Sequence, residues 1–592
     1  MNYWNMQLHP NNLGWTRERE LLEKYHLIGL GDGNEAQQSF QNTMQPGDYV
    51  LVKHGGEIIA LTKVIGNSIY DANVNDLKWF EICREVEILD WYKNEYGFKV
   101  TNRKALERYN ESNKTEQLLS IKKWINMINS KSIIKENKDL LTTNYNLILT
   151  GAPGTGKTYL AKQIAAQMIL DGNEDEETKK NKMGEQCGFV QFHPSYDYTD
   201  FVEGLRPVQD DGGNVGFERK DGVFKEFCKK ALLANSNIDD NVTIKQEFDS
   251  AWDKLLNEVR TNLAIGKLTR IGIWDYGLSS VNSLKYTSTT APSKYTFTIN
   301  KNNVYDAYRG LQARPSGYFQ KYIEDVVTYM NEKHGLKKYE VPQKKITDGK
   351  TPSYVFIIDE INRGEISKIF GELFFSIDPG YRGADGKVRT QYANMQTEPN
   401  EFDAVLKITD TNNCGHFFVP ENVYIIGTMN DIDRSVESMD FAFRRRFAFK
   451  EIKAEDSIQM LDSEDAWGKD ENDNSRRPDQ AVIETIKSKM NAINNVICYE
   501  AKDGEKEDEK SIDGLSSAYH IGASYFLKLA NYRNESGEYV EKSFTDLWDN
   551  HLEGLLREYI RGMQDVEDKI KTLKEVYNNP KATNTDDSGE NQ

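Results

Sequence analysis

The sequence predicts an α/β protein whose central domain is a mostly parallel sheet with helices on both faces. Strands and helices alternate between about residues 140 and 452. Three apolar runs of strand length, at 145–150, 354–358 and 423–426, each lead into polar or glycine-rich residues. We expect a small β-barrel-like domain before this core and a helical region after it.

A chain of 592 residues exceeds what one hydrophobic core supports, so we expect several domains. Changes in the spacing of apolar residues along the sequence indicate their boundaries. The predicted parts are a strand-rich domain at 1–98, a helical linker at 99–139, the core at 140–452, a helical lid at 453–577 and a disordered tail at 578–592. Residues 235–350 interrupt the core as an insertion with helical and β-rich pieces. The sequence assigns no role to this insertion.

Composition excludes several classes of protein. No apolar run reaches membrane-spanning length, and the five cysteines are scattered without a CxxC pair, so we expect a cytoplasmic chain without a membrane segment, a zinc site or a disulfide framework. The formal net charge is −18. Since proteins that bind DNA with their whole surface are usually basic, any contact with nucleic acid should use a local site.

Residues 151–158 match the phosphate-binding pattern G-x-x-x-x-G-K-[ST]. The glycines allow backbone N–H groups to wrap around phosphates, Lys157 supplies a positive charge, and the Thr158 hydroxyl is a ligand for Mg²⁺. A chance glycine-rich turn is the alternative, but a strand pattern precedes the loop and a helix pattern follows it. The predicted nucleotide-binding residues here are Gly151, Pro153, Gly154, Thr155, Gly156, Lys157 and Thr158.

Two carboxylates follow the apolar run 354–358. Asp359 is predicted to bind the nucleotide's Mg²⁺ together with Thr158, and Glu360 to orient and deprotonate the attacking water. An Asp-Glu pair after an apolar run is common by itself. Downstream of a phosphate-binding loop, the pair indicates hydrolysis of a nucleoside triphosphate rather than binding alone.

Two further groups are candidate catalytic residues. Asn430 follows the run 423–426 closely and is placed to hydrogen-bond the water or the γ-phosphate, although a turn residue at a strand end is the simpler reading. Arg444, Arg445 and Arg446 stand in a row between aromatic residues. One or two of them are predicted to reach a phosphate held by a neighbouring subunit, while a solvated basic patch is the alternative.

Together these motifs resemble the AAA+ ring ATPases, and further stretches resemble the McrB-type motor subunits of McrBC-like, modification-dependent restriction systems. Those stretches are Val190–Pro207, Ile358–Gly364, Phe370–Leu373, Met429–Ser435 and Ile521–Phe526. The resemblance implies a hexameric ring, a separate McrC-like nuclease subunit, and GTP as substrate, with ATP left open. Ala523 stands where a histidine is common, and the insertion is unusually large.

The first domain resembles the EVE/PUA-like fold around Gly47–Leu61, which implies recognition of DNA with modified bases. Trp15 and Trp79 are the candidates for an aromatic cage around such a base, although tryptophans of a small domain are more often core residues. Lys53, His54 and Lys63 are candidates for phosphate contacts, or simply a solvated face.

Two other functions fit the same motifs. A MoxR-like AAA+ chaperone would remodel proteins without a nuclease partner. An RNA-directed defence NTPase would use the first domain on RNA instead of DNA. A neighbouring nuclease subunit would favour restriction over the chaperone.

Overall fold

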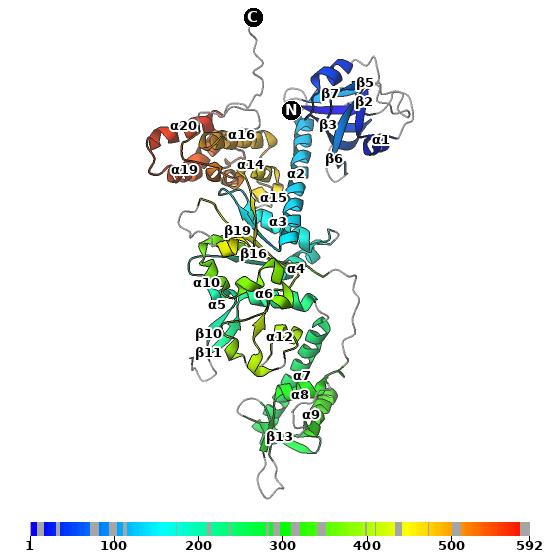
Figure 1. The fold of residues 1–592 in the computed structure, drawn as a ribbon, viewed down its shortest axis with the longest axis vertical. Helices are drawn as coiled ribbons and strands as arrows, with labels where there is room; N and C mark the ends of the chain where they lie inside the picture. Colours follow the sequence, from blue (N-terminus) through cyan, green and yellow to red (C-terminus); the bar gives the residue numbers. More distant parts are fainter. Residues whose placement is uncertain are drawn as a thin grey trace. The chain divides into compact units, whose positions relative to one another are not determined.

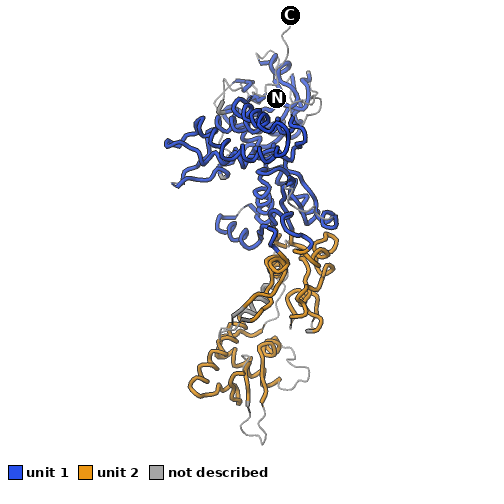
Figure 2. The backbone as a smooth tube through the Cα atoms, turned by 90° about the vertical axis from the view of Figure 1, so that its left-hand side faces the viewer, with its two compact units in different colours: residues 1–196, 357–367, 425–592 blue, residues 197–356, 368–424 orange. Residues whose placement is uncertain are grey.

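The computed structural model describes residues 2–8, 17–30, 36–70, 82–93, 104–109, 115–172, 174–209, 215–235, 238–279, 283–287, 296–309, 320–339, 351–396, 399–408, 410–432, 441–471, 473–499 and 511–580. The chain forms two compact units, shown in two colours in Figure 2. The first comprises residues 1–196, 357–367 and 425–592, and the second comprises residues 197–356 and 368–424. No helix within the described ranges combines the length and the apolar character needed to cross a membrane.

The first unit begins with a seven-stranded sheet in the order β2-β6-β4-β3-β1-β7, with β5 beside β6 (Figure 1). β1 and β3 are parallel, and β3 and β4 form an antiparallel hairpin, whose turn residue Gly55 has a φ of 58°. Trp4, Met6, Val50 and Val52 belong to its core. The elements are β1 (Tyr3–Gln7), α1 (Glu18–Tyr25), β2 (Leu27–Leu30), the π-helix η1 (Ser39–Thr43), β3 (Tyr49–His54), β4 (Glu57–Val64), β5 (Ile69–Tyr70), β6 (Ile82–Trp91) and β7 (Leu106–Tyr109).

The predicted helical linker at 99–139 differs from the structure at its start. β7 is a strand that pairs with β1, and the helix α2 runs over Thr115–Asn144. In β7 only the two end residues, Leu106 and Tyr109, are buried, so its four residues do not alternate as a strand pattern should. The apolar residues at helical spacing in the first half of α2 pack on the N-terminal sheet, in a core with Leu51 and Leu61.

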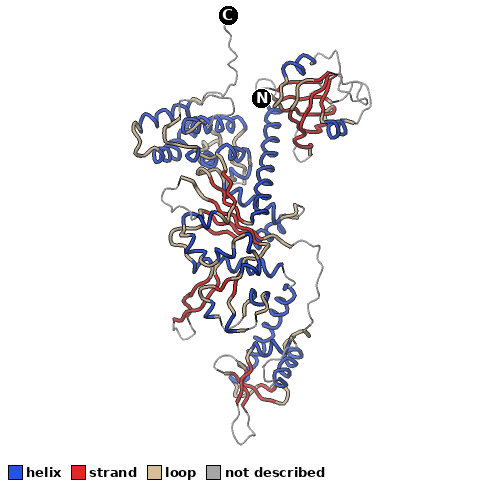
Figure 3. The backbone as a smooth tube through the Cα atoms, in the orientation of Figure 1, coloured by secondary structure: helices blue, strands red, loops and turns tan. Residues whose placement is uncertain are grey.

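A five-stranded sheet follows, in the order β20-β8-β19-β16-β9, with β8 parallel to both β19 and β20. Its strands are β8 (Asn146–Thr150), β9 (Cys187–Gln191), β16 (Tyr354–Asp359), β19 (Val423–Thr428) and β20 (Ala448–Glu451). The three predicted apolar strands are β8, β16 and β19, and they are buried along most of their length. Helices lie on both sides of this sheet in Figure 3. The helical elements of this part of the chain include α3 (Lys157–Ile169), α4 (Glu176–Gln186), η3 (Ile361–Arg363), α10 (Ile366–Phe370) and α13 (Phe441–Arg444).

The C-terminal part of the first unit is helical, as predicted, and has its own core around Ile486, Ile493, Trp548 and Leu573. Its longest helix, α16, is amphipathic and buries one face in that core. The elements are α14 (Ala454–Ser457), η8 (Ile458–Asp462), α15 (Glu464–Trp467), α16 (Gln480–Ile497), η9 (Ser517–Tyr519), α17 (Ala523–Phe526), η10 (Leu527–Asn531), α18 (Glu541–Leu547), η11 (Trp548–Leu552), α19 (Glu553–Tyr559) and α20 (Val566–Asn578). The last residues of the predicted tail, 581–592, lie outside the described residues.

The second unit contains the β10–β11 hairpin, an aromatic core and the predicted insertion. Phe356 of β16 packs edge-on against Phe224 and Phe227 of α6. Its elements before the insertion are α5 (Tyr198–Phe201), β10 (Glu203–Gln209), β11 (Val215–Asp221) and α6 (Val223–Asn235). Those after β16 are α11 (Leu373–Ser376), η4 (Pro379–Tyr381), η5 (Gly383–Gly386), β17 (Val388–Arg389), η6 (Ala393–Met395), α12 (Glu401–Val405), η7 (Thr411–Asn413) and β18 (His416–Phe417).

The insertion at 235–350 has a hydrophobic core of its own. Helix α7 places Trp252 and Leu255 in this core, against Tyr276 and Ile299 of a four-stranded antiparallel sheet. The elements are α7 (Ile238–Ala264), β12 (Thr269–Ile271), β13 (Trp274–Leu278), β14 (Leu284–Thr287), β15 (Thr296–Ile299), α8 (Lys301–Tyr308) and α9 (Gln320–Lys333). The insertion therefore combines helices and strands, as predicted, while the exact domain boundaries remain predictions.

Candidate functional site

The phosphate-binding loop joins β8 to α3. Gly151, Gly154 and Gly156 have φ values of 137°, 78° and 79°, in the region that favours glycine. A Cβ at Gly151 would also lie 2.3 Å from the carbonyl oxygen of Ile452. Because the helix starts at Lys157, the loop's N–H groups lie at the N-terminus of α3, where anions bind favourably.

Lys157 is nearly buried and turns back toward the loop. Its Nζ donates hydrogen bonds to the carbonyl oxygens of Gly151, at 3.0 Å, and Ala152, at 2.9 Å. Burial lowers the pKa of the Lys157 ammonium to about 8, while the carboxylates of Asp431, Glu360 and Asp359 act in the opposite direction. The lysine thus places a cation, protonated at neutral pH, at the start of α3.

Asp359 meets two threonine hydroxyls at the end of β16. Its Oδ1 accepts hydrogen bonds from Thr158 Oγ1, at 2.6 Å, and from Thr428 Oγ1, at 2.7 Å. Carboxylate and hydroxyl oxygens suit Mg²⁺, which takes few protein ligands and completes its shell with phosphate and water. The predicted pair Thr158 and Asp359 is therefore brought together and fits the ion. Thr428 was missed, although it is a polar residue at the end of an apolar strand.

Glu360 has a φ of 52°, which is uncommon for a residue other than glycine and is often found at active sites. Its Oε1 accepts a hydrogen bond from Asn430 Nδ2 at 2.7 Å, and its Oε2 accepts one from Arg363 Nε at 3.2 Å. Asn430 thus contacts Glu360, the carboxylate that is predicted to deprotonate the attacking water. Arg363 was not predicted, although it belongs to the family-like stretch Ile358–Gly364.

The family-like stretch Ile521–Phe526 of the lid lies directly against the phosphate-binding loop. The backbone N–H of Gly522 donates to the carbonyl of Pro153, and that of Ser524 to the carbonyl of Gly154, both at 3.0 Å. A Cβ at Gly522 would lie 2.1 Å from the carbonyl carbon of Gly154. The glycine therefore allows the lid backbone to approach the loop, a contact that the sequence did not predict.

These groups surround a pocket of 570 Å³, within the size range of ligand sites. Besides the residues already described, Lys528 of η10 lines it from the lid, 4.8 Å above the ring of Tyr525. Lys528 was also missed by the sequence, where it stands two residues after the stretch Ile521–Phe526. We call this cavity the phosphate pocket.

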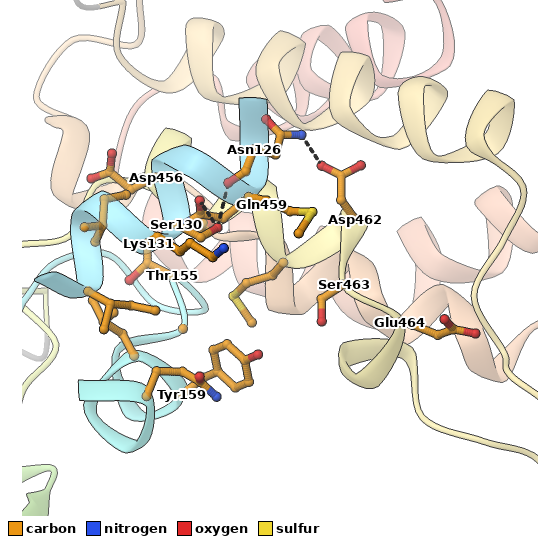
Figure 4. Close-up of a pocket in the computed structure, with 18 of the residues that line it drawn as sticks. Asn126, Ser130, Lys131, Thr155, Tyr159, Asp456, Gln459, Asp462, Ser463 and Glu464 are labelled. Carbon is orange, nitrogen blue, oxygen red and sulfur yellow. Dashed lines mark hydrogen bonds between the residues drawn. The ribbon is translucent and has the colours of Figure 1, made fainter. Parts of the chain in front are cut away.

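A second cavity, of 530 Å³, shares Gly156, Tyr159 and Met460 with the phosphate pocket. Helix α2, the start of α3 and η8 form its walls, as Figure 4 shows. Its lining is mixed. The apolar lining residues include Met127, Ile133, Ile134, Leu160 and Ile452, and the polar ones include Asn126, Ser130, Lys131, Gln459 and Asp462. We call it the side cavity.

The three predicted arginines have three different surroundings. Arg444 is exposed and lies 4.7 Å from the centre of the Phe449 ring. Arg446 is half-buried and donates to the carbonyl of Ala442. Arg445 is exposed, and its guanidinium forms no hydrogen bond or ion pair with any other residue in the described ranges.

The structure describes only some of the residues predicted to bind nucleic acid in the N-terminal domain. Trp15 and Trp79 lie outside the described residues. The expectation of a phosphate contact is wrong for Lys53, whose side chain is fully buried. His54 pairs with the buried Glu18, and Lys63 is half-buried.

In the second unit, the structure joins two other family-like stretches. Asp197 caps α5 by accepting from the N–H of Thr199 at 2.8 Å. Tyr198 donates through its hydroxyl to Glu372 Oε1 at 2.5 Å, and its ring lies close to Gly371. Residues of these stretches therefore support one another's positions, which is a packing role.

Residues 323–447 match the family model of the AAA domain, dynein-related subfamily. Over 526 residues the chain is 25% identical to the type IV methyl-directed restriction enzyme EcoKMcrB subunit of Escherichia coli (strain K12), covering 88% of this chain and 76% of that protein. Over 114 residues it is 28% identical to the type II restriction enzyme BsuMI component YdiS of Bacillus subtilis (strain 168), covering 19% of this chain and 30% of that protein. The AAA domain and this homology support a nucleoside triphosphatase, and the chain is a McrB-like homologue, as its motifs predicted.

Proposed function

We propose that this chain is the nucleotide-hydrolysing motor and target-recognition subunit of a McrBC-like, modification-dependent restriction system. The observation that carries the proposal is one connected set of hydrogen bonds. It links Thr158, Asp359 and Thr428, and then Glu360 and Asn430, around the phosphate pocket. The homology to the E. coli subunit supports the restriction context.

Each side chain has a role in this proposal. Lys157 and the loop N–H groups bind the β- and γ-phosphates, and Thr158 and Asp359 hold Mg²⁺. When bound, Mg²⁺ neutralises the charge that develops on the phosphate oxygens. Glu360 orients the attacking water and accepts its proton, while Asn430 positions the Glu360 carboxylate. Lys528 adds a second cation to the phosphate pocket from the lid.

The side cavity is suited to the base of the nucleotide. It shares Gly156 and Tyr159 with the phosphate pocket, and its mixed lining offers apolar surface to a flat ring and polar groups for hydrogen bonds. GTP is the proposed nucleotide on the strength of the family resemblance. ATP is the competing substrate, and a direct comparison of turnover decides between them.

Ring assembly belongs to the same proposal. Arg445 stands exposed after α13, so a neighbouring copy of the chain can place its own phosphate pocket against it. An arginine that reaches the transferred phosphate in this way stabilises charge in the transition state. The proposed assembly is a hexamer that works with a McrC-like nuclease subunit. The N-terminal sheet would bind DNA with modified bases, with Trp15 and Trp79 as cage candidates.

The test measures phosphate release from GTP and from ATP, each with Mg²⁺, by the full chain and by Glu360→Gln. We expect turnover of at least one nucleotide by the wild type, and retained binding without turnover by the variant. Wild-type hydrolysis in Glu360→Gln would remove the catalytic assignment. The restriction role is tested by adding the neighbouring nuclease subunit and methylated or unmethylated DNA. A failure to stimulate cleavage would favour the MoxR-like chaperone, and selective binding of RNA would favour the RNA-directed function.

A further inference from the structure

Helix α2 presents two faces to two different parts of the first unit. On one face, Leu118, Ile121, Trp124 and Ile125 are buried in one core with residues of the N-terminal sheet. The indole Nε1 of Trp124 also donates to Asp90 Oδ2, at the end of β6, at 2.9 Å. This face therefore ties the position of α2 to the N-terminal sheet, because burial of large apolar side chains resists separation.

The face of α2 that lines the side cavity reaches the lid through two polar contacts. Asn126 Nδ2 donates to Asp462 Oδ2 at 2.5 Å, and Ser130 Oγ donates to Gln459 Oε1 at 2.7 Å, as the dashed lines in Figure 4 show. Asp462 is in turn held by Lys487 of α16, whose Nζ lies 2.9 Å from both carboxylate oxygens. The contacts made by α2 thus continue into the core of the lid.

The C-terminal end of α2 leads straight into the phosphate-binding loop. The helix ends at Asn144, β8 begins at Asn146, and the loop begins at Gly151. Near this end, Lys138 donates to the carbonyl of Gln167 at the end of α3, at 3.2 Å. An uninterrupted helix of 30 residues spans about 45 Å, so α2 can carry a small displacement along its length.

The side cavity lies where these contacts meet. Asn126 and Ser130 line it from α2, and Gln459 and Asp462 line it from η8, so the hydrogen-bonded pairs are also part of its wall. A ring that enters the cavity lies between these two elements and can change the hydrogen bonds that join them. Packed interfaces respond to such changes as units rather than by continuous deformation.

We propose that α2 couples occupancy of the side cavity by a purine base to the N-terminal sheet, so that nucleotide and the target of the N-terminal domain affect each other's binding. This inference rests on the proposed function, since it takes the base of the nucleotide as the occupant. Coupling between two sites is reciprocal, and typical values change affinity about 5- to 150-fold. The Asn126–Asp462 and Ser130–Gln459 contacts carry the coupling to the lid side of the cavity.

The experiment follows hydrogen exchange in the full chain, with Mg²⁺ and with or without a non-hydrolysable GTP analogue. Peptides that cover β1 and β7 report on the N-terminal sheet, and fluorescent-nucleotide binding reports on the pocket. The test variant is Asn126→Ala with Ser130→Ala. The matched control is Lys135→Ala with Asp139→Ala, two exposed positions on the same helix that remove one charge of each sign.

In the wild type and the control, the analogue should slow exchange in β1 and β7 by at least about fivefold, the lower end of typical coupling. In the test variant, measured at an analogue concentration that fluorescent-nucleotide binding shows to be saturating for that variant, this protection should disappear while sedimentation shows the same assembly state. Unchanged exchange in the wild type, or full protection in the test variant, overturns the coupling. Absence of analogue binding, or equal binding by Lys157→Ala, overturns the proposed function and the coupling with it.

Discussion

Thr158 Oγ1 donates a hydrogen bond to Asp359 Oδ1 at 2.6 Å, although the two residues are separated by 201 positions in the chain. The contact forms because β8 and β16 flank β19 in one sheet and end at the same edge. Residues 197–356, which include the whole insertion, leave the first unit and return to it between these two side chains. The described residues that line the phosphate pocket all belong to the first unit.

The contact predicts the behaviour of two variants at Thr158. Thr158→Ala removes a proposed Mg²⁺ ligand and should lower the rate of nucleotide hydrolysis by roughly a hundredfold or more, since such metal contacts are worth several kcal/mol and 1.36 kcal/mol is tenfold. Thr158→Ser keeps the hydroxyl and should stay within about tenfold of the wild type. Phosphate release measured across a series of Mg²⁺ concentrations checks both. Equal rates in the two variants would contradict the metal role.

Burial of Lys157 predicts a pH dependence of nucleotide binding. The protonated ammonium attracts phosphate, and its pKa is lowered to about 8, so affinity in the wild type should be greatest below pH 8 and fall as the pH rises above it. Lys157→Arg stays protonated over this range and should show a flat profile. Titration of a fluorescent nucleotide between pH 7 and 10 provides the measurement. A flat profile in the wild type would show that Lys157 does not titrate in this range.

The lowered pKa of Lys157 affects stability in the opposite direction, because it makes the folded state more stable as the pH rises. The folded pKa lies below the ordinary value of 10.5, so the unfolded chain binds this proton more tightly. The contribution of Lys157 to the free energy of unfolding should therefore rise as the pH increases from about 8 to 10.5. Denaturant unfolding of the wild type and of Lys157→Met, without nucleotide, isolates this contribution. A larger rise with pH in Lys157→Met than in the wild type would contradict the sign.

The environments of the three arginines predict different effects of their removal. Arg445→Ala should reduce hydrolysis by about 10³-fold or more if the side chain acts on the phosphate of a neighbouring subunit. Arg444→Ala should have a smaller effect, because this side chain packs on Phe449 of its own chain. Mixing Arg445→Ala with Lys157→Ala should restore part of the activity, since some interfaces then combine an intact pocket with an intact arginine. Failure of the mixture to exceed its components would argue against action between subunits.

The parts of the site that could be predicted from the sequence are those formed by residues adjacent in the chain. The residues of the phosphate-binding loop are recognisable because each glycine meets a backbone requirement of its own, and Asp359 and Glu360 because they end a fully apolar strand. The surroundings of Arg444, Arg445 and Arg446 were not predictable, because they depend on how α13 and β20 pack. β7 was missed since its burial pattern does not alternate.

The close approach of the lid to the phosphate-binding loop was also not predicted from the sequence. Gly522 has an ordinary φ, so nothing in the sequence indicates that its backbone is crowded. This close approach leads to a prediction for Gly522→Ala. The added Cβ would stand 2.1 Å from the carbonyl carbon of Gly154, where only backbone could move, so the lid must separate from the phosphate-binding loop. We expect nucleotide affinity to fall at least about tenfold, equivalent to roughly 1.4 kcal/mol.

Gly554→Ala is the matched control for this substitution. Gly554 lies in α19, and a Cβ added there would have nothing within 4 Å, so alanine should leave nucleotide binding unchanged and favour the helix slightly. Isothermal titration with nucleotide, together with thermal unfolding, separates lost affinity from lost stability. If Gly522→Ala binds nucleotide as tightly as Gly554→Ala, the contact between the lid and the phosphate-binding loop does not contribute to the phosphate pocket.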